Sequence, residues 1–254
     1  MPIADELYYF EFEGGSGERL PVVLIHGAGG TNLHWPPEMR RLPGFRILAI
    51  DLPGHGKSGG RGQQSIEAYS EALRAWLQAI DVHRAAFVGH SMGSAIALNF
   101  ALEHADQVVG LGLIGSGPSL PVNPDILTGI ESETTFRSTV DKITRWSFSP
   151  DTPERMVELA AERMAESRPS VLQGDFLASD AFDLSDRLGE IQQLALVITG
   201  TNDKMTPVRQ AQFLADQLPN ARLELVAQAG HMVMLEQPEV VARLLRDFLS
   251  QLPF

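Results

Sequence analysis

The sequence has no cysteine among its 254 residues. A chain without cysteine forms no disulfide, no thiolate metal site and no thiolate nucleophile, so covalent catalysis would need another side chain. Long apolar runs are missing too. No stretch of about 18 uncharged apolar residues occurs, and a membrane-spanning helix needs roughly that length. We therefore expect a protein without a membrane span.

Positive charge is also scarce. Lys and Arg number 20 against 32 Asp and Glu, which gives a formal net charge of −12. Such a balance repels the phosphates of nucleic acids and of anionic membranes. Residues 1–6 are acidic at the point where a secretory signal needs basic residues followed by an apolar run. We expect a cytoplasmic protein that binds a small molecule and no nucleic acid.

Several short apolar runs are present, and each ends at or near a glycine-bearing loop. Runs of this kind are typical of strands that are buried on both faces of a parallel sheet. They lie at residues 20–25, 45–50, 85–88, 108–114, 194–199 and 223–226.

Helical periodicity separates most of these runs, at residues 65–80, 92–103, 208–218 and 239–252. Strands that alternate with helices predict an α/β fold with a mostly parallel, doubly wound sheet. Ligands of such sheets bind beyond the carboxyl ends of the strands. We therefore expect the functional residues in the loops that follow the strands.

Residues 116–188 interrupt the alternation, because they contain no strand-like run. Helical stretches around 135–146 and 153–166 predict a helical cap, inserted into a core formed by residues 1–115 and 189–254. Apolar side chains at helical spacing are more often packed core than pocket lining. The sequence therefore identifies no substrate-binding residue among the large side chains of this segment, which include Phe136, Trp146, Phe148, Met156, Phe176 and Phe182.

The sharpest motif is Gly-His-Ser-Met-Gly at residues 89–93, between the strand 85–88 and the helix 92–103. A serine in a tight strand-to-helix turn projects its hydroxyl into the cleft, and small residues two positions away on either side permit the turn. The motif predicts Ser91 as a nucleophile.

A serine nucleophile needs a neutral imidazole to accept its proton and a carboxylate to orient that imidazole. Of the seven histidines, His231 follows the last strand and Gly230, in a loop from which a base can reach the cleft. Asp203 lies just beyond the strand 194–199, again at a carboxyl end. The chain order Ser91, Asp203, His231 is the order expected of an α/β-hydrolase.

The tetrahedral intermediate of acyl transfer needs hydrogen-bond donors aimed at its oxyanion. The backbone N–H of Met92, at the start of a helix, is one candidate. The glycine-rich loop at residues 26–30 offers the N–H of Ala28 as a second.

Two other glycine motifs fit a nucleotide site poorly. Residues 54–58 lack the first glycine of a phosphate-binding loop, because Asp51 stands at that position. Residues 110–115 match a dinucleotide motif, but they overlap a strand and open no helix, so we expect close packing there. The histidines show no metal-ligand spacing with a carboxylate, and the sequence implies no metal and no cofactor.

Taken together, the motifs resemble the α/β-hydrolase superfamily over nearly the whole chain. The resemblance is carried by residues 26–30, 51–58, 89–93, 230–232 and 236–238. It implies a cap inserted after the sixth family strand, where residues 116–188 fall. The family often has two strands before residue 20, whereas this chain supplies only one clear strand at 7–12, so the first strand is expected to be missing or shortened.

Serine at position 91 separates the chain from the dehalogenases and epoxide hydrolases that the superfamily also contains, because those carry aspartate at this turn. We expect a carboxylesterase that acts on small or medium apolar esters through an acyl-enzyme on Ser91. The same residues would serve an enol-lactonase or a carbon–carbon bond hydrolase. A hydrolase-fold binding protein without activity is a further alternative.

Overall fold

The computed structural model describes residues 2–15 and 19–253, so residues 1, 16–18 and 254 of the predicted core lie outside it. Within the described residues, eight strands form one sheet in the order β1-β2-β4-β3-β5-β6-β7-β8. Strand β2 runs antiparallel to β1 and β4, and all other neighbours are parallel. The prediction of a mostly parallel α/β sheet is confirmed. The strands are β1 (Ile3–Ala4), β2 (Leu7–Glu13), β3 (Pro21–Ile25), β4 (Arg46–Ile50), β5 (Ala85–His90), β6 (Val108–Ile114), β7 (Ala195–Gly200) and β8 (Ala221–Val226).

The first strand is shortened. Strand β1 has only two residues and pairs antiparallel with β2, so the sheet does begin with the extra strand that the family often has. Asp5 and Glu6 form the connection with φ values of 46° and 62°. Left-handed backbone at both residues turns the chain back within a very short loop.

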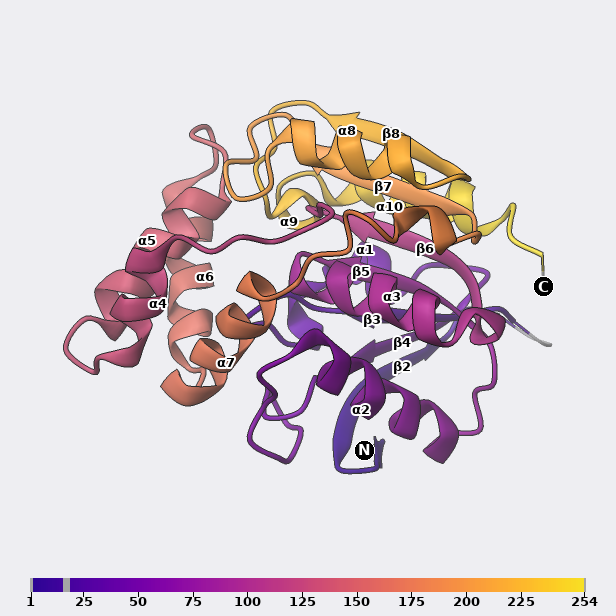
Figure 1. The fold of residues 1–254 in the computed structure, drawn as a ribbon, viewed down its shortest axis with the longest axis horizontal. Helices are drawn as coiled ribbons and strands as arrows, with labels where there is room; N and C mark the ends of the chain where they lie inside the picture. Colours follow the sequence, from indigo (N-terminus) through magenta and orange to yellow (C-terminus); the bar gives the residue numbers. More distant parts are fainter. Residues whose placement is uncertain (1, 16–18, 254) are drawn as a thin grey trace.

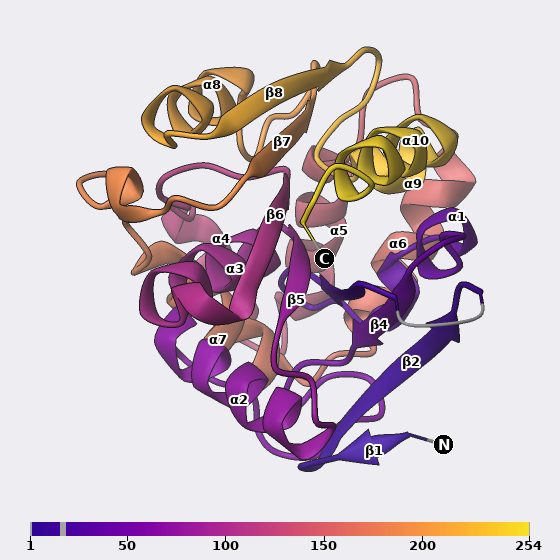
Figure 2. The ribbon, with the colours of Figure 1, turned by 90° about the vertical axis from the view of Figure 1, so that its right-hand side faces the viewer.

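Helices cover both faces of the sheet (Figures 1 and 2). One core cluster contains side chains of α2 (Ile66–Ala79), α3 (Met92–Glu103) and α8 (Val208–Gln217) against one face. A second cluster contains side chains of α1 (Pro37–Arg40), α9 (Val233–Glu236) and α10 (Pro238–Leu249) against the other. The sheet is therefore doubly wound, as predicted.

The structure contains both the expected start of α2 near residue 65 and the expected close packing at residues 110–115. Ser65 caps α2, because its hydroxyl accepts the N–H of Ala68 at 3.2 Å. Gly110 and Gly112 lie in β6, and Gly115 follows the strand with φ 55°. A Cβ on Gly110 would stand 2.6 Å from Leu252, and one on Gly112 would stand 3.2 Å from Leu245. This motif thus serves close packing of the C-terminal region against the sheet.

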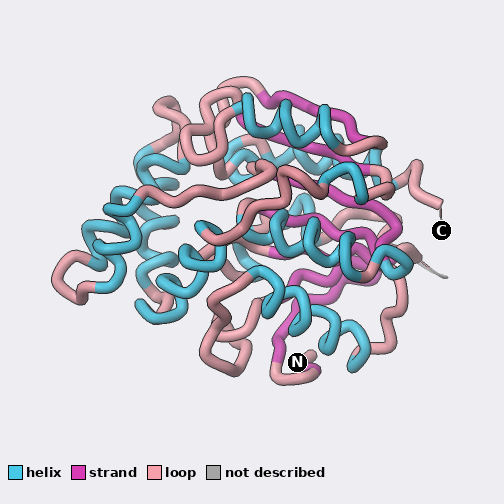
Figure 3. Tube along the Cα trace, in the orientation of Figure 1, coloured by secondary structure: helices cyan, strands magenta, loops and turns pink. Residues whose placement is uncertain are grey.

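Four helices occupy the segment between β6 and β7: α4 (Pro124–Glu131), α5 (Phe136–Ser147), α6 (Glu154–Ala165) and α7 (Pro169–Asp180). Two of them, α5 and α6, correspond to predicted helical stretches, and α4 and α7 were not predicted. The four helices surround a cluster of their own and lie together to the left in Figure 1. Figure 3 draws this stretch as helices and connecting loops. We call α4–α7 the inserted helices.

Among the described residues, no helix combines the length and the apolar character that crossing a bilayer requires.

Candidate functional site

Ser91 occupies a strained turn between β5 and α3. Its backbone has φ 52° and ψ −118°, a conformation that residues with a Cβ seldom adopt. The turn is held in place because the N–H of Ser91 donates to the carbonyl of Ile114 at 2.9 Å. Backbone strain of this kind clusters at functional sites.

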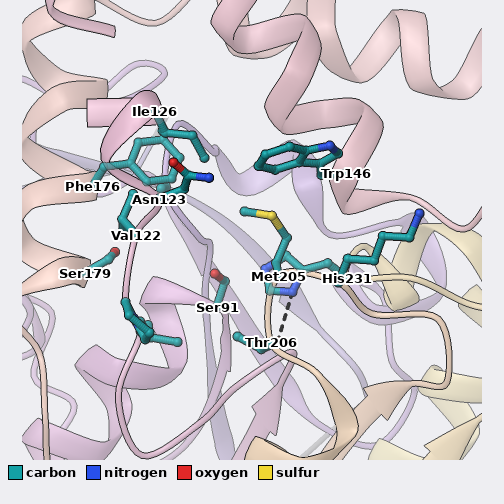
Figure 4. A pocket seen from close by; sticks show the side chains of 14 residues that line it. Ser91, Val122, Asn123, Ile126, Trp146, Phe176, Ser179, Met205, Thr206 and His231 are labelled. Carbon is teal, nitrogen blue, oxygen red and sulfur yellow. Dashed lines mark hydrogen bonds between the residues drawn. The ribbon is translucent and has the colours of Figure 1, made fainter. Parts of the chain in front are cut away.

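The two glycines of the motif are required by their surroundings. A Cβ on Gly89 would stand 2.2 Å from the carbonyl oxygen of Gly93, and a Cβ on Gly93 would stand 2.1 Å from that of Ile25. Both distances are far inside van der Waals contact. The turn therefore packs backbone against backbone and leaves the hydroxyl of Ser91 facing the cleft (Figure 4).

Asp203 and His231, from the loops after β7 and β8, meet in the structure. The Nδ1 of His231 lies 2.9 Å from the Oδ2 of Asp203. Asp203 also accepts the backbone N–H groups of Met205 and Thr206 and the hydroxyl of Thr206, each at 2.8 Å. Because Asp203 only accepts, His231 donates from Nδ1 and keeps Nε2 free for the cavity.

The carboxyl of Asp203 is held in its charged form. Burial by itself would raise the pKa of Asp203, but the charge and hydrogen bond of His231 and the bonds from Thr206 outweigh it, so the pKa lies below its ordinary value of 3.8. A charged, fixed carboxylate can orient an imidazole and stabilise its protonated form.

Ser91 and His231 line one cavity of about 240 Å³ (Figure 4). Most of its remaining wall is apolar and comes from the inserted helices and from the segments that flank them. Trp146 and Phe176 reach the cavity, whereas Phe148 and Phe182 are buried in the two main core clusters. The cavity is lined by Ala28, Ser91, Leu120, Pro121, Val122, Asn123, Ile126, Trp146, Phe176, Ser179, Lys204, Met205, Thr206 and His231.

The structure places the two predicted oxyanion donors close to Ser91 in the fold. Ala28 lines the same cavity, and Met92 begins α3 directly after the serine. His26 supports the loop that carries Ala28, because its Nδ1–H donates to Gly27 at 2.8 Å and its Nε2 accepts the N–H of Leu52 at 3.1 Å. Burial, with the nearby charge of His55, keeps the pKa of His26 well below its ordinary value, so this ring is neutral.

Two supporting residues had no role in the sequence prediction. His90 donates from Nε2 to the carbonyl of His231 at 3.0 Å, and burial, followed by the charge of His231, lowers its pKa well below the ordinary value. Glu236 accepts the N–H of Gly230 at 2.8 Å and that of Ser149 at 2.9 Å. His90 lies in the motif 89–93 and Glu236 in the motif 236–238, but the partners of both residues are determined by tertiary contacts. Together they hold the backbone on each side of His231.

No group of three or more His, Cys, Asp or Glu within residues 2–15 and 19–253 is arranged to hold a metal ion.

A profile of the alpha/beta hydrolase family matches residues 22–244. The chain belongs to the alpha/beta hydrolase family. This hydrolase is 30% identical over 261 residues to the 2-hydroxy-6-oxo-6-phenylhexa-2,4-dienoate hydrolase of Burkholderia cepacia, an alignment that covers 94% of this chain and 90% of that protein. It is also 30% identical over 242 residues to the pimeloyl-[acyl-carrier protein] methyl ester esterase of Neisseria meningitidis serogroup C, which covers 90% of this chain and 93% of the relative.

Among solved structures, the fold is similar to that of the enol-lactonase from Burkholderia xenovorans LB400. The TM-score is 0.90 at 24% identity, and the match covers 96% of each chain. The likeness shows a shared fold. The family and the curated relatives show a hydrolase of the alpha/beta family.

Proposed function

We propose that this hydrolase cleaves carboxylic esters through an acyl-enzyme on Ser91. The observation that carries the proposal is the meeting, on one apolar cavity, of a serine in a strained turn and an imidazole anchored by a buried carboxylate. A serine hydroxyl becomes nucleophilic when such an imidazole accepts its proton.

The proposed reaction has two halves. In the first, Nε2 of His231 takes the proton of Ser91 while Oγ attacks the ester carbonyl, and the N–H groups of Ala28 and Met92 bind the oxyanion. Collapse of this intermediate expels the alcohol, which receives the proton from His231. In the second, His231 deprotonates a water that attacks the acyl-enzyme, and the acid leaves with Ser91 restored.

The size and lining of the cavity favour small or medium apolar esters. Its volume of about 240 Å³ lies just below the usual range of ligand pockets, roughly 300–1,000 Å³. Trp146 and Phe176 from the inserted helices form part of its wall. We propose on this ground that residues 116–188 act as a cap over a core of residues 1–115 and 189–254.

The test uses p-nitrophenyl esters from acetate to decanoate with the wild type and Ser91→Ala. We expect turnover that falls with the longest chains, and its loss in Ser91→Ala by at least 10³-fold, because removal of a triad nucleophile leaves only residual catalysis. Ser70→Ala is the matched control, since Ser70 is fully buried in α2 and its hydroxyl has no partner among the described residues. Turnover that persists in Ser91→Ala would contradict the proposal.

A second candidate is carbon–carbon bond or enol-lactone hydrolysis by the same residues. It is favoured by the relative of Burkholderia cepacia, whose name specifies a dienoate with a 6-oxo and a phenyl group. Comparing kcat/KM for a 6-phenyl dienoate of that type, an enol-lactone and a simple ester distinguishes the candidates. A chain that turns over none of them and resists fluorophosphonate labelling at Ser91 would instead be a binding protein.

A further inference from the structure

Asp175, in the inserted helix α7, is a fully buried carboxylate that reaches out of the inserted helices into the core. Its Oδ2 accepts the backbone N–H of Gly29 at 2.8 Å and lies 2.8 Å from Nε2 of His55. Its Oδ1 accepts the hydroxyl of Tyr69 at 2.5 Å. Both oxygens of this buried carboxylate have hydrogen-bond partners, so its position is well defined.

His55 forms the cationic half of a buried ion pair with Asp175. Its Nδ1 lies 3.0 Å from the carbonyl of Pro53 and its Nε2 faces the carboxylate, so both ring nitrogens face acceptors and both must donate. Burial by itself would lower the pKa of His55, but the charge and hydrogen bond of Asp175 raise it above the ordinary value. The pair fixes Asp175 from the core side.

Gly29 lies against the inserted helices α6 and α7 and the loop between them. It adopts φ 63°, and a Cβ at this position would stand 2.7 Å from Leu172 of α7 and 3.2 Å from Met164 of α6. The hydroxyl of Ser167 lies 3.4 Å from its carbonyl oxygen. Two segments that lie 146 residues apart in the sequence, the loop 26–30 and helix α7, are thus joined through the backbone of one glycine.

The N–H of Gly29 belongs to the same peptide unit as the carbonyl of Ala28. Because a peptide unit is planar, fixing that N–H fixes the plane on one side of the Ala28 Cα. The N–H of Ala28 lies on the other side of the same Cα, and its direction depends on the loop being held. Oxyanion donors contribute most when they are already oriented before the reaction.

We propose that Asp175 is the positioning residue of the oxyanion loop: by accepting the N–H of Gly29, it aligns the N–H of Ala28 toward the oxyanion. This inference rests on the proposed function and deepens it. The inserted helices then complete the hydrolytic site in addition to enclosing the substrate. Asp175 touches neither substrate nor reacting atoms.

The proposal predicts a change in kcat without a change in KM. Asp175→Ala removes the acceptor, and we expect kcat to fall about 30-fold with KM within about threefold. Loss of a whole oxyanion donor costs about 10²–10³, and misalignment should cost less. Asp175→Asn retains an oxygen for Gly29, so its kcat should return to within about fivefold of the wild type.

Asp175→Ala leaves the charged imidazole of His55 buried without its partner, and this loss can prevent the variant from folding. The double variant His55→Leu/Asp175→Leu removes both buried charges, and such replacements are often neutral or stabilising. It too lacks the acceptor, so kcat should again fall about 30-fold although the melting temperature is maintained. Arg168→Gln is the matched control, because Arg168 directly precedes α7 and its side chain donates to the carbonyls of Gly54 and Gly60 instead of to Gly29. Its kcat should stay within twofold.

A second measurement needs no turnover. Amide hydrogen exchange followed on peptides that cover residues 26–33 should accelerate at least tenfold in the double variant and stay unchanged in Arg168→Gln. A double variant with wild-type kcat, or with wild-type protection of this loop, overturns the proposal. If the wild type hydrolyses nothing, the proposed function fails, and the exchange measurement still decides whether Asp175 holds the loop.

Discussion

Gly93→Ala is the most demanding test of the packing around Ser91. Gly93 lies in the first turn of α3, and in an ordinary helix the change from glycine to alanine stabilises by about 1 kcal/mol. Here the added Cβ would stand 2.1 Å from the carbonyl oxygen of Ile25 and 2.7 Å from that of His26. Both atoms are backbone, so no side chain can rotate to make room.

The expected loss of stability follows from how far the backbones of α3 and β3 must move apart. Ordinary contacts of a Cβ begin at about 3.4 Å, so α3 and the end of β3 must separate by more than 1 Å. Overpacking typically costs about 1–3 kcal/mol, and a clash of this size with backbone atoms belongs in the upper part of that range, about 2–3 kcal/mol. After subtraction of the helix gain of about 1 kcal/mol, we expect a net loss of about 1–2 kcal/mol in the free energy of unfolding. Since a misplacement of about 1 Å can cost 10²-fold in rate, kcat should fall by about that factor.

The assay combines urea unfolding with ester turnover below the unfolding range. Gly189→Ala is the matched control, because no atom lies within 4 Å of a Cβ built at Gly189, and it should be neutral or slightly stabilising with unchanged kcat. A Gly93→Ala variant that is as stable and active as the wild type would refute the packing argument. Equal losses in both variants would refute it too.

Two further predictions concern Asp203 and the buried pair of His55 and Asp175. Asp203→Asn should lower kcat by about 10³–10⁴-fold in steady-state assays, because an amide that donates to Nδ1 selects the wrong tautomer of His231, and a loss below tenfold would contradict this role. For His55, the folded pKa is raised above 6.5, so its contribution to the free energy of unfolding is fully present below pH 6.5 and is lost as the pH rises through the folded value. Urea unfolding from pH 6 to 9 should show this decline in the wild type and not in His55→Leu/Asp175→Leu; equal slopes would contradict it.

The sequence suffices to locate the groups proposed for the chemistry, because their positions follow from local rules. Buried parallel strands have a distinctive apolar pattern, and the residues after them must lie at one edge of the sheet. Asp203 and His231 could therefore be placed after β7 and β8, and they meet at 2.9 Å. The glycines that flank Ser91 are recognised from their spacing in the motif. The requirement for Gly89 is local, since its Cβ would meet Gly93, whereas that for Gly93 comes from Ile25 at the end of β3.

The supporting residues could not be predicted, because their partners are distant in the chain. Asp175 is one aspartate within a helix, and no local pattern indicates that it binds a loop 146 residues away. Helix α7 itself gives a weak signal, since it contains Gly174 in its interior, and packing rather than propensity must stabilise it. The role of Glu236 similarly depends on Ser149, 87 positions earlier.

The tie between Gly29 and Asp175 also sets an order of events during synthesis. The ribosome adds about 5–20 residues per second, so the 146 residues between the two positions take roughly 7–30 s. During that interval, the nascent chain contains the loop 26–30 and then gains the serine turn at residues 89–93. It does not yet contain Asp175, the carboxylate that secures the loop. Strands β1 to β6 are therefore synthesised before the carboxylate that secures the loop, so most of the sheet can form while the loop still lacks this contact.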